Sequence, residues 1–401
     1  MTPTRNTYRR LAAIGATVAI VLGAAACSRP STAGNTSTAA ATTAAPSSAA
    51  STAAASDTGS STADTASASA TSSSGGETAA ASSSSGSSSA SSGAVFTGVE
   101  VPQGDALRVG YFGFAKANSF AQATWAGVQE AAKENNATAE FLDPNFDGPT
   151  QVNQIQDAVT SKRFDVMVIQ ANDGTAVVQP IKQALAAGIT VVVEFTPVGG
   201  KYDTIEAQVP GVISIVDAPT INGQGLADLS TGACKQLAVT PCKVAYLQGF
   251  ENYPLDAART KAAEDGIKAA GNELVASVVG GYTPDSGRAA FQNVLQAHPD
   301  VNVVIGSSQA IEGAAPLAEG KNILFVGNGG STQAFEGVNS GKWYGTYVIA
   351  EKTEGKVATE LGLAKARGAQ VPTSTDARTL TPYMSLGTKD AIQGQTAEYS
   401  D

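Results

Sequence analysis

Residues 107–142, LRVGYFGFAKANSFAQATWAGVQEAAKENNATAEFL, decide the fold class of this chain. The stretch opens with a short apolar run, LRVGYF, and continues through a loop into apolar side chains at helical spacing over residues 120–135. A second apolar run follows at residues 138–142. Strand, helix and strand in this order are typical of a βαβ unit, whose strands lie parallel in one sheet.

The same alternation continues along most of the chain. Short apolar runs such as VMVI are separated by amphipathic segments, as expected for buried parallel strands and their crossover helices. The expected strands are 166–169, 189–195, 212–216, 243–247, 274–279, 303–305 and 323–326, and the expected helices are 149–161, 175–187, 223–237, 255–270, 286–297 and 311–318. The pattern therefore predicts an α/β protein with two doubly wound parallel-sheet lobes in series.

The loops after the strands are the expected ligand-binding positions. Open parallel sheets bind ligands beyond the carboxyl ends of their strands, so two facing lobes would place such loops on both sides of one cleft. These loops are residues 113–120, 170–175, 194–197, 248–254, 306–309 and 327–331.

The first 26 residues have the layout of a secretory signal peptide. Arg5, Arg9 and Arg10 precede an apolar run of about sixteen residues, which is short for a membrane-spanning helix. The run ends in LGAAAC, which resembles a bacterial lipobox, and this resemblance implies lipidation of Cys27 and attachment to the outer face of the cell membrane. An ordinary signal peptide cut after Ala26, with an incidental cysteine, is the alternative.

Residues 27–95 are predicted to be a disordered tether. They consist almost entirely of Ser, Ala, Thr and Gly and contain few charges. Such a composition buries too little apolar surface to offset the entropy lost on ordering the chain.

Charge and cysteine content exclude several classes of protein. The net charge is −10, and we find no cluster of Lys and Arg of the kind that binds nucleic acid. Besides Cys27, the chain contains Cys234 and Cys242, whose short spacing in an oxidising exterior favours a disulfide, with free thiols as the alternative. Because His298 is the only histidine and lies far from the cysteines in sequence, we expect no metal site. The sequence contains neither a dinucleotide-binding glycine fingerprint nor a G-x-x-x-x-G-K-[ST] phosphate loop, and we expect no cofactor.

The strand-end loops resemble those of type I periplasmic binding proteins, the ribose- and galactose-binding group, over nearly all of residues 106–387. The segments that carry the resemblance are VGYFGFAKANSFAQATWAGVQEAA, QANDGTAVVQPIKQALAAGITVVV, VAYLQGFENYPLDAARTKAAEDGI, FQNVLQAHPDVNVVIGSSQAIEGA and ILFVGNGGSTQAFEGVNSGKWYGTYV.

The resemblance implies two Rossmann-like lobes joined by three hinge crossings, near Asp217, residues 347–350 and residues 380–383. The expected N-terminal lobe is residues 106–217 and 348–380, and the expected C-terminal lobe is residues 218–347 and 381–392. The implied function is capture of a small polar ligand, a carbohydrate first of all, for the permease of an ABC importer. We expect a monomer.

The resemblance also indicates the ligand-binding residues. Asn118 and Phe120 match the polar residue and the aromatic that the family has after its first strand, Arg259 matches an arginine early in the second lobe, and Tyr282 matches a further aromatic wall. Loop position adds Asn172, Asp173, Glu194, Ser307, Ser308, Gln309 and Asn328. Helix capping and core packing are the competing interpretations for these residues. Tyr253 is a candidate for the cleft mouth, and Trp125 is expected in the core.

Departures from the family pattern leave the ligand class open. Around Glu194, Ser307 and Asn328 the family carries further carboxylates, which this chain lacks. A polyol, a nucleoside or a signalling furanose is therefore an alternative ligand, and a membrane sensor is an alternative partner. A serine hydrolase would need a histidine after Ser307, whereas His298 precedes it, so we expect no enzymatic activity.

Overall fold

The computed structural model of the chain describes residues 95–401. The expected signal peptide, the lipidation of Cys27 and the tether up to residue 94 lie outside the described residues. Within residues 95–401, none of the helices combines the length and the apolar character needed to cross a membrane.

Two six-stranded sheets form the framework. The first has the order β11-β5-β4-β3-β1-β2 and the second has the order β12-β10-β9-β8-β6-β7. Neighbours run parallel except β12, which is antiparallel to β10. In both sheets the first two strands along the chain sit side by side and the next three follow on the other side, which is a doubly wound order. The predicted fold class is thus confirmed.

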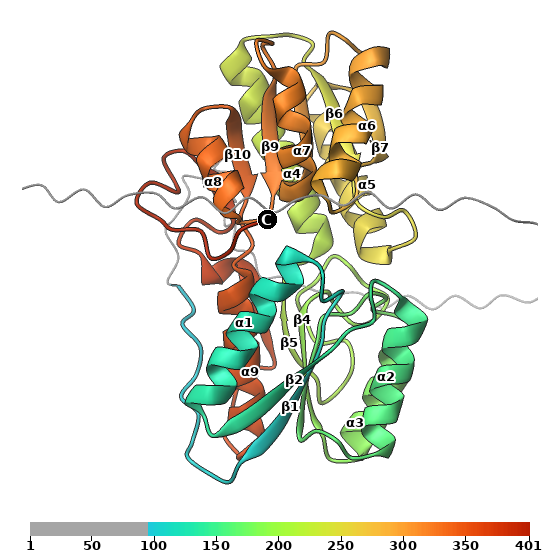
Figure 1. Ribbon diagram of the computed structural model, residues 1–401, viewed down its shortest axis with the longest axis vertical. Coiled ribbons are helices and arrows are strands. Elements are labelled where there is room, and N and C mark those ends of the chain that lie inside the picture. Colours follow the sequence, from blue (N-terminus) through green and yellow to red (C-terminus); the bar gives the residue numbers. More distant parts are fainter. Residues whose placement is uncertain (1–94) are drawn as a thin grey trace, which may run out of the picture. The chain divides into compact units, whose positions relative to one another are not determined.

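The first sheet has helices on both of its faces (Figure 1). Its strands are β1 (Leu107–Phe112), β2 (Ala137–Leu142), β3 (Val166–Ile169), β4 (Thr190–Phe195), β5 (Ile213–Val216) and β11 (Ser374–Asp376). Helices α1 (Ser119–Glu134) and α9 (Glu351–Ala366) cover one face, and α2 (Gly148–Thr160) and α3 (Val178–Ala186) cover the other. Strands β3 and β5 are buried along their whole length, which explains their uninterrupted apolar sequences.

The second sheet is flanked in the same way. Its strands are β6 (Lys243–Gln248), β7 (Glu273–Val279), β8 (Val303–Ser307), β9 (Leu324–Asn328), β10 (Trp343–Tyr347) and β12 (Leu386–Thr388). Its helices are α4 (Pro219–Leu237), α5 (Pro254–Ala269), α6 (Pro284–Ala297), α7 (Ser308–Ala314) with the 3-10 turn η1 (Ala315–Ala318), and α8 (Thr332–Asn339). Contacts between α4 and α5 and between α6 and α7 build its two helical layers.

The chain passes between the two sheets three times. It leaves the first sheet after β5 and starts α4 after two intervening residues, and it returns after β10 through residues 348–350 into α9. The last passage runs from β11 through the 3-10 turn η2 (Ala377–Leu380) to β12. These connections lie where the hinge crossings were expected, and the lobe limits given above remain our prediction.

Several helix boundaries differ from the sequence-based prediction. Helix α4 begins at Pro219 instead of residue 223, because a proline at the first helical position has the required backbone angle and no N–H group to leave unsatisfied. Helix α3 begins later than expected, since Asp173 accepts hydrogen bonds from the backbone N–H groups of Thr175 and Ala176 and holds a turn there.

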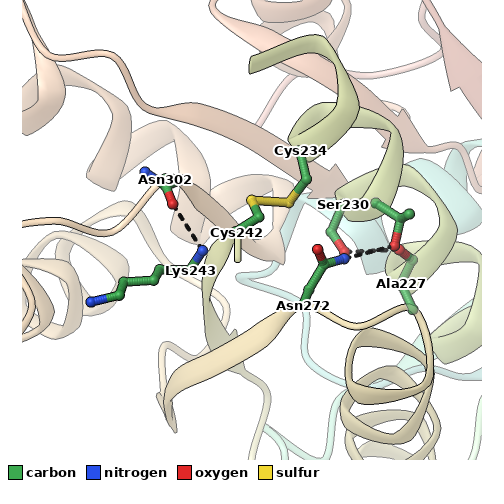
Figure 2. The surroundings of a disulfide bond; sticks show 8 residues. Ala227, Ser230, Cys234, Cys242, Lys243, Asn272 and Asn302 are labelled. Carbon is green, nitrogen blue, oxygen red and sulfur yellow. Dashed lines mark hydrogen bonds between the residues drawn. A yellow bond between two sulfur atoms is a disulfide. The ribbon is translucent and has the colours of Figure 1, made fainter. Parts of the chain in front are cut away.

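A disulfide joins Cys234 to Cys242 (Figure 2). Cys234 lies near the end of α4 and Cys242 directly precedes β6, so the bond closes the connection between these two elements. Both cysteines are buried, and Cys242 is followed by Lys243, whose backbone N–H donates to the side-chain oxygen of Asn302. The structure therefore contains the predicted pairing.

Candidate ligand-binding site

A small cavity lies between the carboxyl ends of the two sheets. Its lining residues come from the first lobe, from the second lobe and from the second crossing between them. They are Phe114, Asn118, Phe120, Phe146 and Phe195; Tyr253, Leu255, Arg259, Tyr282, Gln309 and Asn328; and Ile349. The cavity thus lies where doubly wound sheets bind their ligands.

Four phenylalanines form the first lobe's side of the cavity. Phe120 on α1 meets Phe195 at the end of β4 with ring centroids 4.9 Å apart, at an interplanar angle of 65°. Phe114, just after β1, contacts Phe195 edge to face at 6.0 Å and stacks near Phe146 at 6.4 Å. The rings support one another, so their exposed faces form a largely apolar wall.

The second lobe contributes a buried ion pair. Arg259 on α5 is 4% exposed and its Nη2 atom donates to Oδ1 of Asp256, one turn earlier on the same helix. Nη2 also donates to the Tyr282 hydroxyl at 3.0 Å, and that hydroxyl donates to Asp256 Oδ1 at 2.5 Å. Asp256 Oδ2 accepts from the backbone N–H of Phe250 at 2.8 Å. The guanidinium is therefore held in one position.

The surroundings of Arg259 keep it charged. Burial alone lowers the pKa of a guanidinium, but the oxygens of Tyr282 and Asp256 outweigh burial and raise the pKa of Arg259 above its ordinary value. Burial also raises the pKa of Tyr282 well above its usual range, so its phenol stays protonated. A positive charge matched by Asp256 leaves this part of the cavity close to neutral, which suits an uncharged polar ligand.

Two side chains of the cavity lining form hydrogen bonds between the lobes. The Tyr253 hydroxyl, at the start of α5, donates to Oδ1 of Asn172 at 3.1 Å and to the carbonyl oxygen of Phe146. Gln309 Nε2 on α7 donates to the Ser119 hydroxyl on α1 at 3.2 Å. Both residues also line the cavity. Contacts that hold the lobes together thus occur around the same space that a ligand would fill.

Six of the eleven residues predicted for ligand binding line the cavity: Asn118, Phe120, Arg259, Tyr282, Gln309 and Asn328. Tyr253, the candidate for the cleft mouth, lines it as well. Trp125 stacks on Tyr111 at 6.1 Å, and in this position it packs against the core of the first lobe.

The other five predicted residues are absent from the cavity lining. Asp173 caps the turn before α3, and Ser307 caps α7 by accepting from the Ala310 N–H while it donates to the Gly281 carbonyl. Ser308 is fully buried, with its hydroxyl against Gly329. Asn172 is also buried and reaches the site only through its bond to Tyr253.

Glu194 lies beneath the cavity, beside another buried carboxylate. It is 1% exposed, and burial raises its pKa to about 8. Glu354 on α9 accepts from the Phe195 N–H at 2.7 Å, and burial together with the charge of Glu194 raises its pKa well above the ordinary value. Phe195 has a φ of 56°, so the backbone leaves regular strand geometry at this residue, and its ring packs against Phe120 while Glu194 stays buried near Glu354.

Five apolar residues of the lining are not among the residues predicted for ligand binding: Phe114, Phe146, Phe195, Leu255 and Ile349. Phenylalanine, leucine and isoleucine are typical core residues, so their type alone gives no functional signal. Position offers a partial signal, because Phe114 and Phe195 both lie at or just after the carboxyl end of a predicted strand.

Within residues 95–401, no group of three or more His, Cys, Asp or Glu side chains is arranged so that it could hold a metal ion. The cavity itself contains no carboxylate among its lining residues. Its chemistry is that of hydrogen-bond donors and aromatic faces.

Comparison with known families agrees with this architecture. Residues 109–370 match the family described as periplasmic binding protein domain. The chain belongs to this family. Periplasmic binding proteins are extracytoplasmic, solute-binding components of transport systems, and the predicted resemblance is thereby confirmed.

The names or titles of several similar proteins state a ligand. The ribose import binding protein of Bacillus subtilis (strain 168) is 24% identical over 242 residues, which cover 58% of this chain and 73% of the relative. An ABC transporter solute-binding protein from Agrobacterium vitis, bound to α-D-tagatopyranose, superposes with a TM-score of 0.61 at 20% identity over 74% of this chain and 100% of its own. A solute-binding protein of an ABC transporter from Mycobacterium smegmatis, bound to glycerol, superposes with a TM-score of 0.59 at 22% identity. The match covers 74% of this chain and 99% of that protein.

Proposed function

We propose that this protein binds an uncharged sugar or polyol in the cavity between its lobes and delivers it to an ABC importer. The observation that carries the proposal is the cavity itself, where aromatic faces from one lobe oppose a fixed guanidinium from the other. Aromatic rings stack on the apolar faces of sugar rings, and a planar guanidinium donates in parallel to neighbouring oxygens. The named ligands of the relatives, ribose, tagatopyranose and glycerol, support this choice.

Capture is proposed to close the lobes on the ligand, since the bonds of Tyr253 and Gln309 reach across the cavity. We propose no catalytic role. The Ser307 hydroxyl is engaged as a helix cap and by the Gly281 carbonyl, and Ser308 is buried, so neither is placed as a nucleophile.

The test is a thermal-shift screen of the purified protein with Cys27→Ser, so that no lipid is attached. Sugars, polyols, nucleosides and amino acids are added one at a time. A ligand that binds only the folded protein raises the Tm by mass action, by an amount that grows with concentration. We expect a sugar or polyol to raise the Tm. A response to nucleosides or amino acids alone, or to nothing in the panel, would reject the proposal.

We further propose that the mature protein acts as a monomer anchored by a lipid on Cys27. The lipobox-like sequence LGAAAC ahead of a polar, Ser-rich stretch supports the anchor. Mass spectrometry of the N-terminal peptide from the membrane fraction tests it: acyl chains on Cys27 are expected, and an unmodified Cys27 in released protein would contradict it.

A further inference from the structure

Hydrogen-bond acceptors are scarce among the side chains that line the cavity. Asn118 Oδ1 accepts from the Ala121 N–H at 3.1 Å as the cap of α1, and Asn328 Oδ1 accepts from Asn222 Nδ2 at 3.1 Å. The hydroxyl protons of Tyr253 and Tyr282 are donated within the protein. Among the lining side chains of the described chain, two oxygen atoms accept no hydrogen bond: Oε1 of Gln309 and the hydroxyl oxygen of Tyr253.

Donors, in contrast, are plentiful. Arg259 uses Nη2 for Asp256 and Tyr282, and within residues 95–401 no hydrogen bond engages its Nε or Nη1 atoms. The same holds for Nδ2 of Asn118 and Nδ2 of Asn328, whose oxygens are engaged as described. Four nitrogen atoms are therefore left to donate, against two side-chain oxygen atoms that accept no hydrogen bond.

A chain of bonds from the hinge sets the orientation of the Asn328 amide. Asp217, at the first crossing, accepts from Asn222 Nδ2 at 3.3 Å, and the same Nδ2 donates to Asn328 Oδ1. Asn222 and Asp217 are both buried, so solvent does not compete for these bonds. With its oxygen facing Asn222, Asn328 presents its NH₂ group to the cavity as a donor. The Ala121 N–H donates to the oxygen of Asn118, so the NH₂ group of Asn118 is likewise left as a donor.

This imbalance discriminates between ligands. Each sugar hydroxyl can accept one of the free donors, but its own proton then needs an acceptor. A buried hydroxyl proton without an acceptor weakens binding by about tenfold. Ring ethers, carbonyl oxygens and O-methyl groups accept without donating, and methyl or methylene groups fit against the phenylalanines.

We propose that the preferred ligand is a monosaccharide-sized ring with fewer hydroxyl donors than a hexose, such as a deoxy or O-methylated sugar. The inference rests on the proposed function, because it specifies which sugars the same cavity selects. The four phenylalanines accommodate the deoxygenated side of the ring, and Arg259, Asn118 and Asn328 donate to its remaining oxygens.

Matched sugar pairs test the inference by isothermal titration calorimetry on the full protein with Cys27→Ser. The pairs are D-galactose and 6-deoxy-D-galactose, L-mannose and 6-deoxy-L-mannose, D-ribose and 2-deoxy-D-ribose, and D-glucose and its methyl α-glycoside. We expect the donor-poor member of at least one pair to bind tenfold or more tightly than its partner. Equal or tighter binding of the fully hydroxylated member in every pair that binds would overturn the inference while the proposed function stands. Absence of binding by any sugar would overturn both.

A variant that exchanges one of the free donors for an acceptor tests whether the excess of donors causes the preference. Asn328→Asp keeps the oxygen that accepts from Asn222 and replaces the free donor by an acceptor. We expect it to reduce the preference for the donor-poor sugar about tenfold, with the hydroxylated partner gaining affinity. Asn322→Asp, the same change at an exposed position outside the cavity, is expected to leave the preference unchanged. An unchanged preference in a folded Asn328→Asp protein, with folding checked by Tm, would overturn the inference.

Discussion

Arg259 is expected to contribute both to the stability of the folded protein and to ligand binding. Replacing it with methionine leaves the Asp256 carboxylate buried with only Tyr282 and the Phe250 N–H as donors. We expect Arg259→Met to lower the free energy of unfolding by about 3 kcal/mol and to abolish ligand binding.

The double variant Arg259→Met, Asp256→Leu distinguishes the effect of Arg259 on stability from its effect on ligand binding. Because the buried charge is then removed as well, stability should return close to that of the unsubstituted protein, while binding stays lost. Urea denaturation and calorimetry measure the two effects. Binding retained by the stable double variant would show that Arg259 has only a structural role.

The sequence indicated part of the site in advance. Asn118 and Arg259 were predicted from the resemblance to the family, and Gln309 from its position in a strand-end loop; all three line the cavity. Phe195 does not stand out, because it ends the run of residues 189–195 that is predicted as one buried strand. Glu194 was selected for its position in a strand-end loop, and the structure places it in the interior near Glu354, outside the cavity lining.

At the scale of elements, α1 and α9 show how segments far apart in sequence depend on each other. The two helices cross at Gly127 and Gly355, where a Cβ on Gly127 would overlap the carbonyl oxygen of Lys352 and one on Gly355 would overlap that of Thr124. Close approach of the two backbones therefore requires glycine at both positions. Helix α1 carries Asn118 as its cap and Phe120 in its first turn, so this crossing also positions the cavity wall.

We expect Gly127→Ala to lower the free energy of unfolding by about 2 kcal/mol, since the helices must move apart, despite the higher helix propensity of alanine. Gly200→Ala is the control, because its Cβ would meet no atom within 4 Å. Thermal unfolding of both variants measures the difference. A Gly127→Ala protein as stable as the control would mean that the crossing adapts without cost.

At the scale of the whole molecule, buried carboxylates beneath the cavity make stability depend on pH. Burial raises the pKa of Glu194 from 4.5 to about 8 and that of Asp217 from 3.8 to about 7. In the unfolded chain both groups lose their protons near their ordinary pKa values, whereas in the folded protein they keep them. The stability they contribute is therefore fully present below about pH 4 and is lost as the pH rises toward 8.

We expect the Tm to fall by several degrees between pH 5 and pH 8, and Glu194→Gln to reduce that fall. The variant should exceed the unsubstituted protein in Tm at pH 8 and approach it at pH 5. Glu336→Gln, at an exposed position, serves as the control. Differential scanning calorimetry measures the Tm of each protein across this pH range. If the Tm of Glu194→Gln and that of the unsubstituted protein fall in parallel, the raised pKa of Glu194 is contradicted.

The sequence by itself determined the local features of this protein. Apolar runs and helical spacing identified the alternating strands and helices, and the short separation of Cys234 and Cys242 indicated the disulfide, because each of these depends on residues close together in the chain. Only the tertiary structure decided which strand-end side chains share a cavity, that four phenylalanines form its wall, and that α9 returns to pack on α1. These features depend on strand register, burial and contacts between residues more than 200 positions apart, such as Gly127 and Lys352, and no local pattern specifies them.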